Sequence, residues 1–489
     1  MFPARSMLSA DRVQLSGTPI LRLLRSGQRV RKRVAECLLT PCRGEFPPRD
    51  RPGSEPFFCL MPSPEDQSEI SPLVLNDLQR LPLDELLARA GTVGVRIRPD
   101  STRHHLVLDQ ARHQLSRGGC LTGQGLLERN GDAGVIRWTA FDLKPGPEDV
   151  FVPPSLMRNT GLQAGLMLDF SIRLPRDRER GLVVDQLISV EGIPLSEWKT
   201  PTEFEKLTPL FPNRRILLET PVNPEVAARA VDLVSPLGMG QRGLIAAPPR
   251  AGKTIMLQTL ARSIRANHPD AALILLLVDE RPEEVTDMRR ALDCEIYAST
   301  FDEPVTRHVQ ICEAVSDRSQ RLVELGRDVI ILLDSITRMA RAYNNLQPKK
   351  GRTMSGGVDA KALAKPRKFF GSARNVEEGG SLTILGTALI ETYSRMDDLI
   401  FEEFKGTGNM ELHLDKSIAE LRIFPAIHIV KSGTRREELL FHPEEYERVV
   451  QLRRQLSELP SAEAMEVLSS NLLHTRSNAE LLLTGLRGI

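Results

Sequence analysis

Apolar and polar positions along the chain change their spacing several times, and each spacing predicts a different kind of element. Leucines recur at near-helical intervals from Pro72 to about Gly119, which predicts a small helical unit. Short strand-like runs separated by Gly, Pro and Asn follow over residues 121–192 and predict a small β-barrel. Residues 1–72 are rich in Arg and Pro and carry little periodic apolar signal, so we expect them to be disordered.

The pattern changes again after a connector, and residues 222 to about 440 alternate apolar strands with helical segments. The predicted strands are 243–247, 272–279, 329–334 and 382–389. Their nearly continuous apolar character is what a parallel sheet buried on both faces requires. From residue 442 to residue 486 the chain reads as helices.

These spacings predict an α/β protein built from several units. The predicted parts are an extension (1–72), a helical unit (73–119), a barrel (120–195), a connector (196–221), an α/β domain (222–440) and C-terminal helices (441–489). The composition fits globular units, with 41% hydrophobic and 26% charged residues. A net charge of only +1 argues against a wholly basic surface and leaves room for a locally basic channel.

Composition also narrows the compartment. The six cysteines form no Cys-x-x-Cys pair, so neither a zinc site nor a disulfide framework is indicated, and we expect a reducing cytoplasm. No run of about 18 apolar residues occurs, so we expect no membrane partner. The basic start could attract RNA or serve as a targeting segment, although a solvated tail is the simpler interpretation.

The strongest chemical signal is a phosphate-binding loop (P-loop) that follows the first predicted strand of the α/β domain. It consists of Ala247, Pro248, Pro249, Arg250, Ala251, Gly252, Lys253 and Thr254, with Ala in place of the usual first Gly. Backbone N–H groups and a helix N-terminus hold phosphates, Lys253 neutralises their charge and the Thr254 hydroxyl ligates Mg²⁺. The pattern predicts ATP and Mg²⁺ as cofactors.

Carboxylates end two further predicted strands, at the edge where an open α/β sheet binds its ligands. Asp334 ends one strand, where the acid that holds the magnesium water shell is expected. Asp279 and Glu280 end another, so one of them could orient and deprotonate the attacking water. A single carboxylate after a strand is usually a helix cap or a solvated end. Together with the P-loop, in this order along the chain, they favour an ATPase site.

A basic, glycine-punctuated segment lies between residues 347 and 357, with the sequence QPKKGRTMSGG. Such a loop can approach a phosphate backbone closely, although most basic loops are only solvated. Composition alone leaves RNA binding and solvation equally open.

Four motifs resemble those of the transcription termination factor Rho family: VDERPEEV at 278–285, DSITR at 334–338, EFKGTGNM at 403–410 and SGTR at 432–435. The resemblance covers about residues 75–475 and is densest from 240 to 440. It implies a RecA-like P-loop ATPase domain after an oligonucleotide-binding (OB-type, cold-shock-like) barrel. It also implies a homohexamer that hydrolyses ATP, pulls RNA through its centre as a helicase and displaces RNA polymerase.

The resemblance also implies roles for single residues. Lys253 and Thr254 would bind phosphate and Mg²⁺, Glu280 would be the general base and Asp334 the magnesium-site acid. Arg281 would contact the γ-phosphate, while Ile255 and Phe424 would line the nucleotide site. Arg435 would act as an arginine finger in the neighbouring subunit's site, with Arg422 as a second such arginine.

The implied RNA contacts fall on three loops. Arg352, Met354 and Ser355 match the family's central loop, Arg395 and Lys405 match a second loop and its support, and Arg137 matches a barrel contact. Arg250, Arg352 and Arg395 stand where the family pattern shows Lys, which keeps the charge but not the geometry.

The barrel departs from the family pattern. The segment DAGVIR at 132–137 has no Phe or Tyr where aromatic stacking residues are expected. Stacking supplies on the order of 1–3 kcal/mol per base, so we expect weaker and less selective RNA binding. Strand alternation places Trp138 opposite Arg137, which predicts that Trp138 belongs to the barrel core.

Two other functions remain open. A ring ATPase of the ATP synthase or secretion type also places a small β-domain before a P-loop domain, and RNA-stimulated turnover would discriminate it. An RNA-binding protein with a dead nucleotide site would be expected to lack Lys253, Glu280 or Asp334, and all three are present.

Overall fold

The computed structural model describes residues 71–98, 100–176, 179, 181–222, 225–347, 357–359 and 361–487. The extension expected to be disordered therefore lies, apart from its last two residues, outside the described residues. The helical unit comprises β1 (Leu73–Val74), α2 (Leu75–Arg80), α3 (Leu83–Val93) and α4 (Arg103–Ser116). Thr102 caps α4 by accepting a hydrogen bond from His105 N, which explains where this helix begins.

The next unit is a closed barrel of short strands. They are β2 (Leu121–Asn130), β3 (Ala133–Arg137), β4 (Val150–Val152), β5 (Met167–Arg173) and β6 (Leu182–Val190), and they pair in the order β2-β3-β4-β6-β5 with β5 closing onto β2. Helix α5 (Pro154–Thr160) and strand β7 (Ile193–Pro194) complete it. Trp138 is 1% exposed and its indole N–H donates to Glu148 O, which confirms its predicted place in the core.

The α/β domain is organised around a mostly parallel sheet. Its strands are β11 (Arg242–Ala247), β12 (Ala272–Glu280), β13 (Glu295–Thr300), β14 (Asp328–Asp334), β16 (Ser381–Leu389) and β17 (Met410–His413), in the spatial order β13-β12-β14-β16-β11-β17. All these neighbours pair in parallel. Shorter strands are β8 (Pro209–Leu210), β9 (Arg215–Ile216), β10 (Leu237–Gly238), β15 (Arg374–Val376) and β18 (Gly433–Thr434). The four strands predicted from the sequence are all present.

Both faces of this sheet are buried, because its side chains alternate between two apolar clusters. Leu273, Leu275 and Leu277 belong to one cluster, whereas Ile274 and Leu276 belong to the other. A strand buried on both faces can be apolar at every position, which is the pattern that predicted a parallel sheet.

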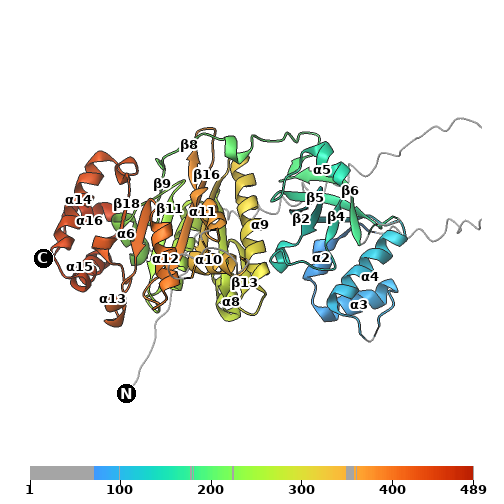
Figure 1. Cartoon of the computed structure of the whole chain (residues 1–489), viewed down its shortest axis with the longest axis horizontal. Coiled ribbons are helices and arrows are strands. Elements are labelled where there is room, and N and C mark those ends of the chain that lie inside the picture. The colour runs from blue at the N-terminus through green and yellow to red at the C-terminus, as the bar shows by residue number, and fades with distance from the viewer. Residues whose placement is uncertain are drawn as a thin grey trace, which may run out of the picture. The chain divides into compact units, whose positions relative to one another are not determined.

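Helices cover the two faces. They are α6 (Val226–Val234), α7 (Lys253–Asn267), α8 (Pro282–Ala291), α9 (Val305–Glu324), α10 (Ile336–Asn345), α11 (Ala364–Gly371), α12 (Arg395–Lys405) and α13 (Lys416–Glu420). The C-terminal helices α14 (Pro443–Ser457), α15 (Ser461–His474) and α16 (Asn478–Thr484) group beside α6 (Figure 1). Among the described residues, no helix is long and apolar enough to cross a membrane.

Candidate active site

The P-loop joins the carboxyl end of β11 to the first residue of α7. Arg250 and Gly252 have left-handed backbone angles, with φ of 68° and 91°. Gly252 is the N-cap of α7, and no side chain caps this helix. The first N–H groups of a helix have no partner within it, so here they are free to hold an anion.

Lys253 and Asp334 face each other at the carboxyl edge of the sheet. The Lys253 ammonium lies 2.6 Å from Asp334 Oδ1, and the Thr387 hydroxyl donates to the same oxygen at 2.8 Å. Three strands converge here, because β16 lies between β11 and β14. The strand order thus brings together two residues that are 81 positions apart in the sequence.

Glu280 ends β12 with its side chain in the same site. It is 3% exposed, and its Oε2 lies 3.9 Å from the Lys253 ammonium and has no hydrogen-bond partner among the described residues. Burial raises the pKa of Glu280 to about 7, against the opposing effect of Lys253, and the Asp334 carboxylate raises it further. An unpaired buried acceptor with a pKa near neutrality is suited to take a proton from water.

A bulge in β12 separates Asp279 from Glu280. The pairing with β13 shifts between Val278 and Glu280, and Asp279 has a φ of 56°. The Asp279 side chain is consequently more exposed, at 37%, than that of Glu280. The structure therefore places Glu280, rather than Asp279, beside Lys253.

Sequence reasoning missed two residues around these carboxylates. Arg338, on the first turn of α10, lies 3.5 Å from Glu280 Oε1 and 3.9 Å from Asp279 Oδ2. His308, on α9, lies 3.8 Å from Asp279 Oδ1, and burial lowers its pKa. Arg338 could have been found, since it closes the DSITR motif one helical turn after Asp334. No sequence signal marks His308, which the fold brings in from a different helix.

A cavity of about 300 Å³ adjoins the P-loop on the other side of Gly252. Its walls include Val226 of α6, Ile255 of α7 and the half-exposed ring of Phe424. A side chain at Gly252 would come within 3.7 Å of that ring. The volume and the apolar walls fit a flat base whose phosphates lie on the loop.

Two side chains fix the entrance of α6 at this cavity. The Thr259 hydroxyl and the Arg262 Nε both donate to the Glu225 carboxylate, and Glu225 is the N-cap of α6. Because Glu225 and Val226 line the cavity, these bonds hold one wall against α7.

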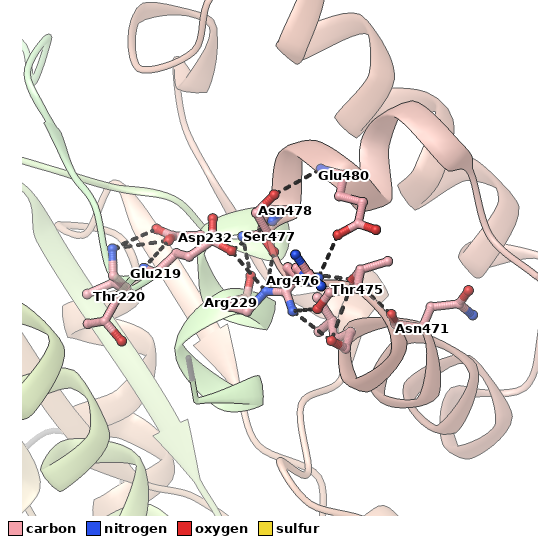
Figure 2. Close-up of polar contacts among 12 residues, drawn as sticks. Glu219, Thr220, Arg229, Asp232, Asn471, Thr475, Arg476, Ser477, Asn478 and Glu480 are labelled. Atoms are coloured by element: carbon pink, nitrogen blue, oxygen red, sulfur yellow. Dashed lines mark hydrogen bonds and ion pairs between the residues drawn. The ribbon is translucent and has the colours of Figure 1, made fainter. Parts of the chain in front are cut away.

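Arg229 fastens the far side of α6 to the C-terminal helices (Figure 2). Its guanidinium is 1% exposed and donates to Leu472 O, Thr475 O, the Thr475 hydroxyl and the Asn478 side-chain oxygen at 2.6–3.0 Å. Glu219 lies 3.1 Å from Arg229 Nε and also accepts from Asn478 N. Burial lowers the pKa of Arg229, and this set of acceptors offsets the cost of burying its charge.

The arginines expected to act in trans lie on the surface. Arg422 and Arg435 are both exposed, and their side chains have no hydrogen-bond or ion-pair partner among the described residues. Arg422 has a φ of 64°, and Arg435 is anchored by its backbone N–H, which donates to Asn409 O at 2.9 Å. Arg281 is 64% exposed, with Glu284 3.9 Å away.

The expected RNA contacts are divided. Arg395 is the exposed first residue of α12, and Lys405 is its last residue, with its ammonium 5.7 Å from the Phe401 ring centre. Arg352, Met354 and Ser355 lie outside the described residues.

Arg137 is not a free cation on the barrel. Its guanidinium pairs with Glu128 at 2.6 Å and also with Asp149, and the side chain is only 14% exposed. Val135 lies opposite Phe151 in the β3–β4 pair, and both are half-buried. Phe151 is therefore the aromatic that the structure brings next to the segment lacking Phe and Tyr.

Two family models match this chain. Residues 227–434 match the ATP synthase alpha/beta family, nucleotide-binding domain, and residues 123–196 match the Rho termination factor, RNA-binding domain. Among solved structures, an ATPase from the type III secretion system of pathogenic bacteria aligns with a TM-score of 0.50 and 19% identity, covering 64% of this chain and 92% of that one. At this identity the likeness concerns the fold alone.

Curated relatives are much closer. The transcription termination factor Rho of Akkermansia muciniphila is 46% identical over 427 residues, covering 86% of this chain and 90% of the relative. The transcription termination factors Rho of Chromobacterium violaceum and Pseudomonas aeruginosa are each 48% identical and cover 83% of this chain and 97–98% of the relatives.

Fold, site and comparisons together define a class: the chain is a RecA-like P-loop ATPase that carries an OB-type RNA-binding barrel. Within this class it belongs to the transcription termination factor Rho family.

Proposed function

We propose that this chain terminates transcription as an RNA-dependent ATPase and 5'-3' helicase, pulling nascent RNA through a homohexameric ring and releasing RNA polymerase. The observation that carries the ATPase part is the buried Glu280 carboxylate, which has an unpaired oxygen 3.9 Å from the P-loop Lys253. Membership of the Rho family supports the RNA-dependent part.

Nucleotide binding follows from the P-loop and its cavity. The adenine enters beside Phe424, and the phosphates lie on the first N–H groups of α7. The Lys253 ammonium then exchanges part of its contact with Asp334 for the phosphate oxygens. Arg281 lies at the surface, at the N-cap of α8, and we assign it to the γ-phosphate.

The residues present fit a magnesium ion. Thr254 follows Lys253 on α7, and Asp334 is held by the Thr387 hydroxyl on the neighbouring strand. Mg²⁺ takes few protein ligands and keeps waters and phosphate oxygens, so one hydroxyl and one carboxylate are enough. When bound, the ion neutralises charge on the phosphates; Thr254 and Asp334 would hold it.

The hydrolytic step uses Glu280. Its free oxygen accepts a hydrogen bond from a water and takes the proton as the water attacks the γ-phosphate. Arg338 holds the other carboxylate oxygen at 3.5 Å and so restricts the rotation of this base. The negative charge that develops on the phosphoryl group needs further cations, which Arg435 and Arg422 of a neighbouring subunit supply in trans.

RNA contacts connect this chemistry to translocation. We assign Arg352, Met354, Ser355, Arg395 and Lys405 to the RNA in the ring centre. Arg137 is bound to two carboxylates, so its contribution on the barrel requires that one of these ion pairs opens.

The test is ATP hydrolysis by the full chain with and without poly(C), poly(U) and poly(A). Stimulation by RNA, abolished by Lys253→Ala, is the expected result. RNA-independent hydrolysis would favour the ring ATPases of the secretion or ATP synthase type instead, and absence of hydrolysis in any condition would overturn both assignments.

A further inference from the structure

Tyr393 is the most exposed of the large hydrophobic side chains in the described part of the chain. It is 99% exposed, whereas the next such residue, Val222, is 75% exposed. Tyr393 lies in the short loop between the end of β16 at Leu389 and the start of α12 at Arg395. Its ring contacts no other ring and makes no hydrogen bond within the described residues.

The backbone at this position is strained. Tyr393 has a φ of 60°, and Glu391 in the same loop has a φ of 55°. Left-handed backbone costs a bulky L-residue roughly 1–2 kcal/mol, a cost that glycine does not bear. No contact of the exposed ring within the subunit offsets this cost, so its benefit must come from outside the subunit.

The loop is braced, so the ring is held out from a firm base. The Thr392 hydroxyl donates to Asp397 Oδ2 at 2.6 Å, and Arg341 donates to both oxygens of the same buried carboxylate at 2.6 and 2.8 Å. Asp397 N donates to Ser394 O at 2.9 Å. Three residues around Tyr393 are thereby tied to α10 and α12.

The surroundings of the ring are polar and cationic. Glu391 and Arg395 are exposed, and Thr392 and Ser394 are half-buried. A protein-binding hot spot needs an apolar rim that excludes water, and this loop has none. One flat face beside one arginine matches instead the contacts that single-stranded nucleic acids use, with an aromatic under a base and a cation at the phosphate.

We propose that Tyr393 is a base-stacking platform for single-stranded RNA, with Arg395 at the adjoining phosphate. The proposal rests on the proposed function and deepens it. The barrel lacks Phe and Tyr over residues 132–137, so in this chain the α/β domain supplies stacking energy that the barrel segment does not.

The experiment compares Tyr393→Phe, Tyr393→Gly and Tyr393→Asn in the full chain, measuring RNA-stimulated ATP hydrolysis against poly(U) concentration. Phe retains the ring and should behave as wild type. Gly and Asn both accept a left-handed backbone, so they remove the ring without adding strain. They should raise the half-maximal RNA concentration roughly 5- to 100-fold, the equivalent of one lost stack.

Salt dependence separates stacking from charge. Tyr393→Gly should leave the slope of log affinity against log salt unchanged, whereas Arg395→Ala should reduce it by about one. A direct readout is photo-cross-linking of 5-iodouracil-substituted RNA, which should map to residue 393 by mass spectrometry. Cross-linking needs no turnover, so it decides the stacking role even if the wild type proves RNA-independent, which would overturn the proposed function alone.

Two results would overturn the stacking role. One is a Tyr393→Gly chain with wild-type RNA dependence and no cross-link at residue 393 in the parent. The other is loss of ring assembly in Tyr393→Gly, seen by mass photometry without RNA, since that would make the ring a contact between subunits.

Discussion

At the scale of single residues, the site is organised by charges whose partners are incomplete. Glu280 keeps one buried oxygen unpaired, and Asp334 already binds Lys253 and Thr387. Two neighbouring carboxylates with such different partners can take different roles, one as a base and the other as a fixed anion.

Glu280→Gln should reduce turnover by about 10²- to 10⁴-fold, because the amide cannot accept the proton. Nucleotide binding should persist, since Lys253 and the loop remain, and this can be measured with a fluorescent ATP analogue. Retention of near-normal turnover would show that another group is the base.

The same substitution should stabilise the nucleotide-free chain at alkaline pH. The pKa of Glu280 is about 7 when folded, above its ordinary value of 4.5, so the folded state binds more protons between these values and loses stability as pH rises through them. At pH 8 Glu280→Gln should gain on the order of 1 kcal/mol and melt a few degrees higher; near pH 4.5 the difference should vanish. Equal melting temperatures at pH 8 would contradict the raised pKa.

At the scale of elements, α6 links the nucleotide cavity to the C-terminal helices. Its first residues line the cavity, and Arg229 near its middle binds α15, α16 and the turn between them. A change in the Arg229 cluster should therefore reach the nucleotide.

Arg229→Lys keeps the charge but cannot reach all four acceptors, so it should destabilise the fold by about 2–4 kcal/mol and raise KM for ATP more than it lowers kcat. Arg476→Lys is the matched control, because Arg476 lies in the same turn with an exposed side chain (Figure 2). Thermal melting and steady-state kinetics decide; identical values for the two variants would remove Arg229 from this role.

The barrel makes a separate prediction. Ala133→Phe with Val135→Phe adds two rings on the strand that pairs with β4 and Phe151, so binding of short oligo(C) should tighten by roughly 5-fold or more. Filter binding of oligo(C) and oligo(A) to the full chain measures it. Tight, cytosine-selective binding before substitution would mean that Phe151 or another aromatic already serves as the platform.

At the scale of the whole molecule, each site is expected to be completed by a neighbouring subunit. Arg435 is exposed and has no side-chain partner within the described part of its own subunit, as a trans-acting finger requires. Mixing Arg435→Ala with Lys253→Ala should restore some RNA-stimulated hydrolysis, because one intact P-loop then meets one intact arginine. Background activity in mixed rings, with subunit exchange verified, would place Arg435 in its own site or show that several consecutive sites must be intact.

The sequence by itself determined the features that depend on local spacing. The apolar runs predicted the strands, the P-loop was visible between β11 and α7, and alternation placed Trp138 in the core. Only the tertiary structure decided which distant groups meet: that Glu280 and not Asp279 faces Lys253, that Arg137 is bound by Glu128 and Asp149, and that Arg229 reaches Asn478. The reason is physical, because strand order and helix docking join residues tens to hundreds of positions apart, and no local period along the chain records those pairings.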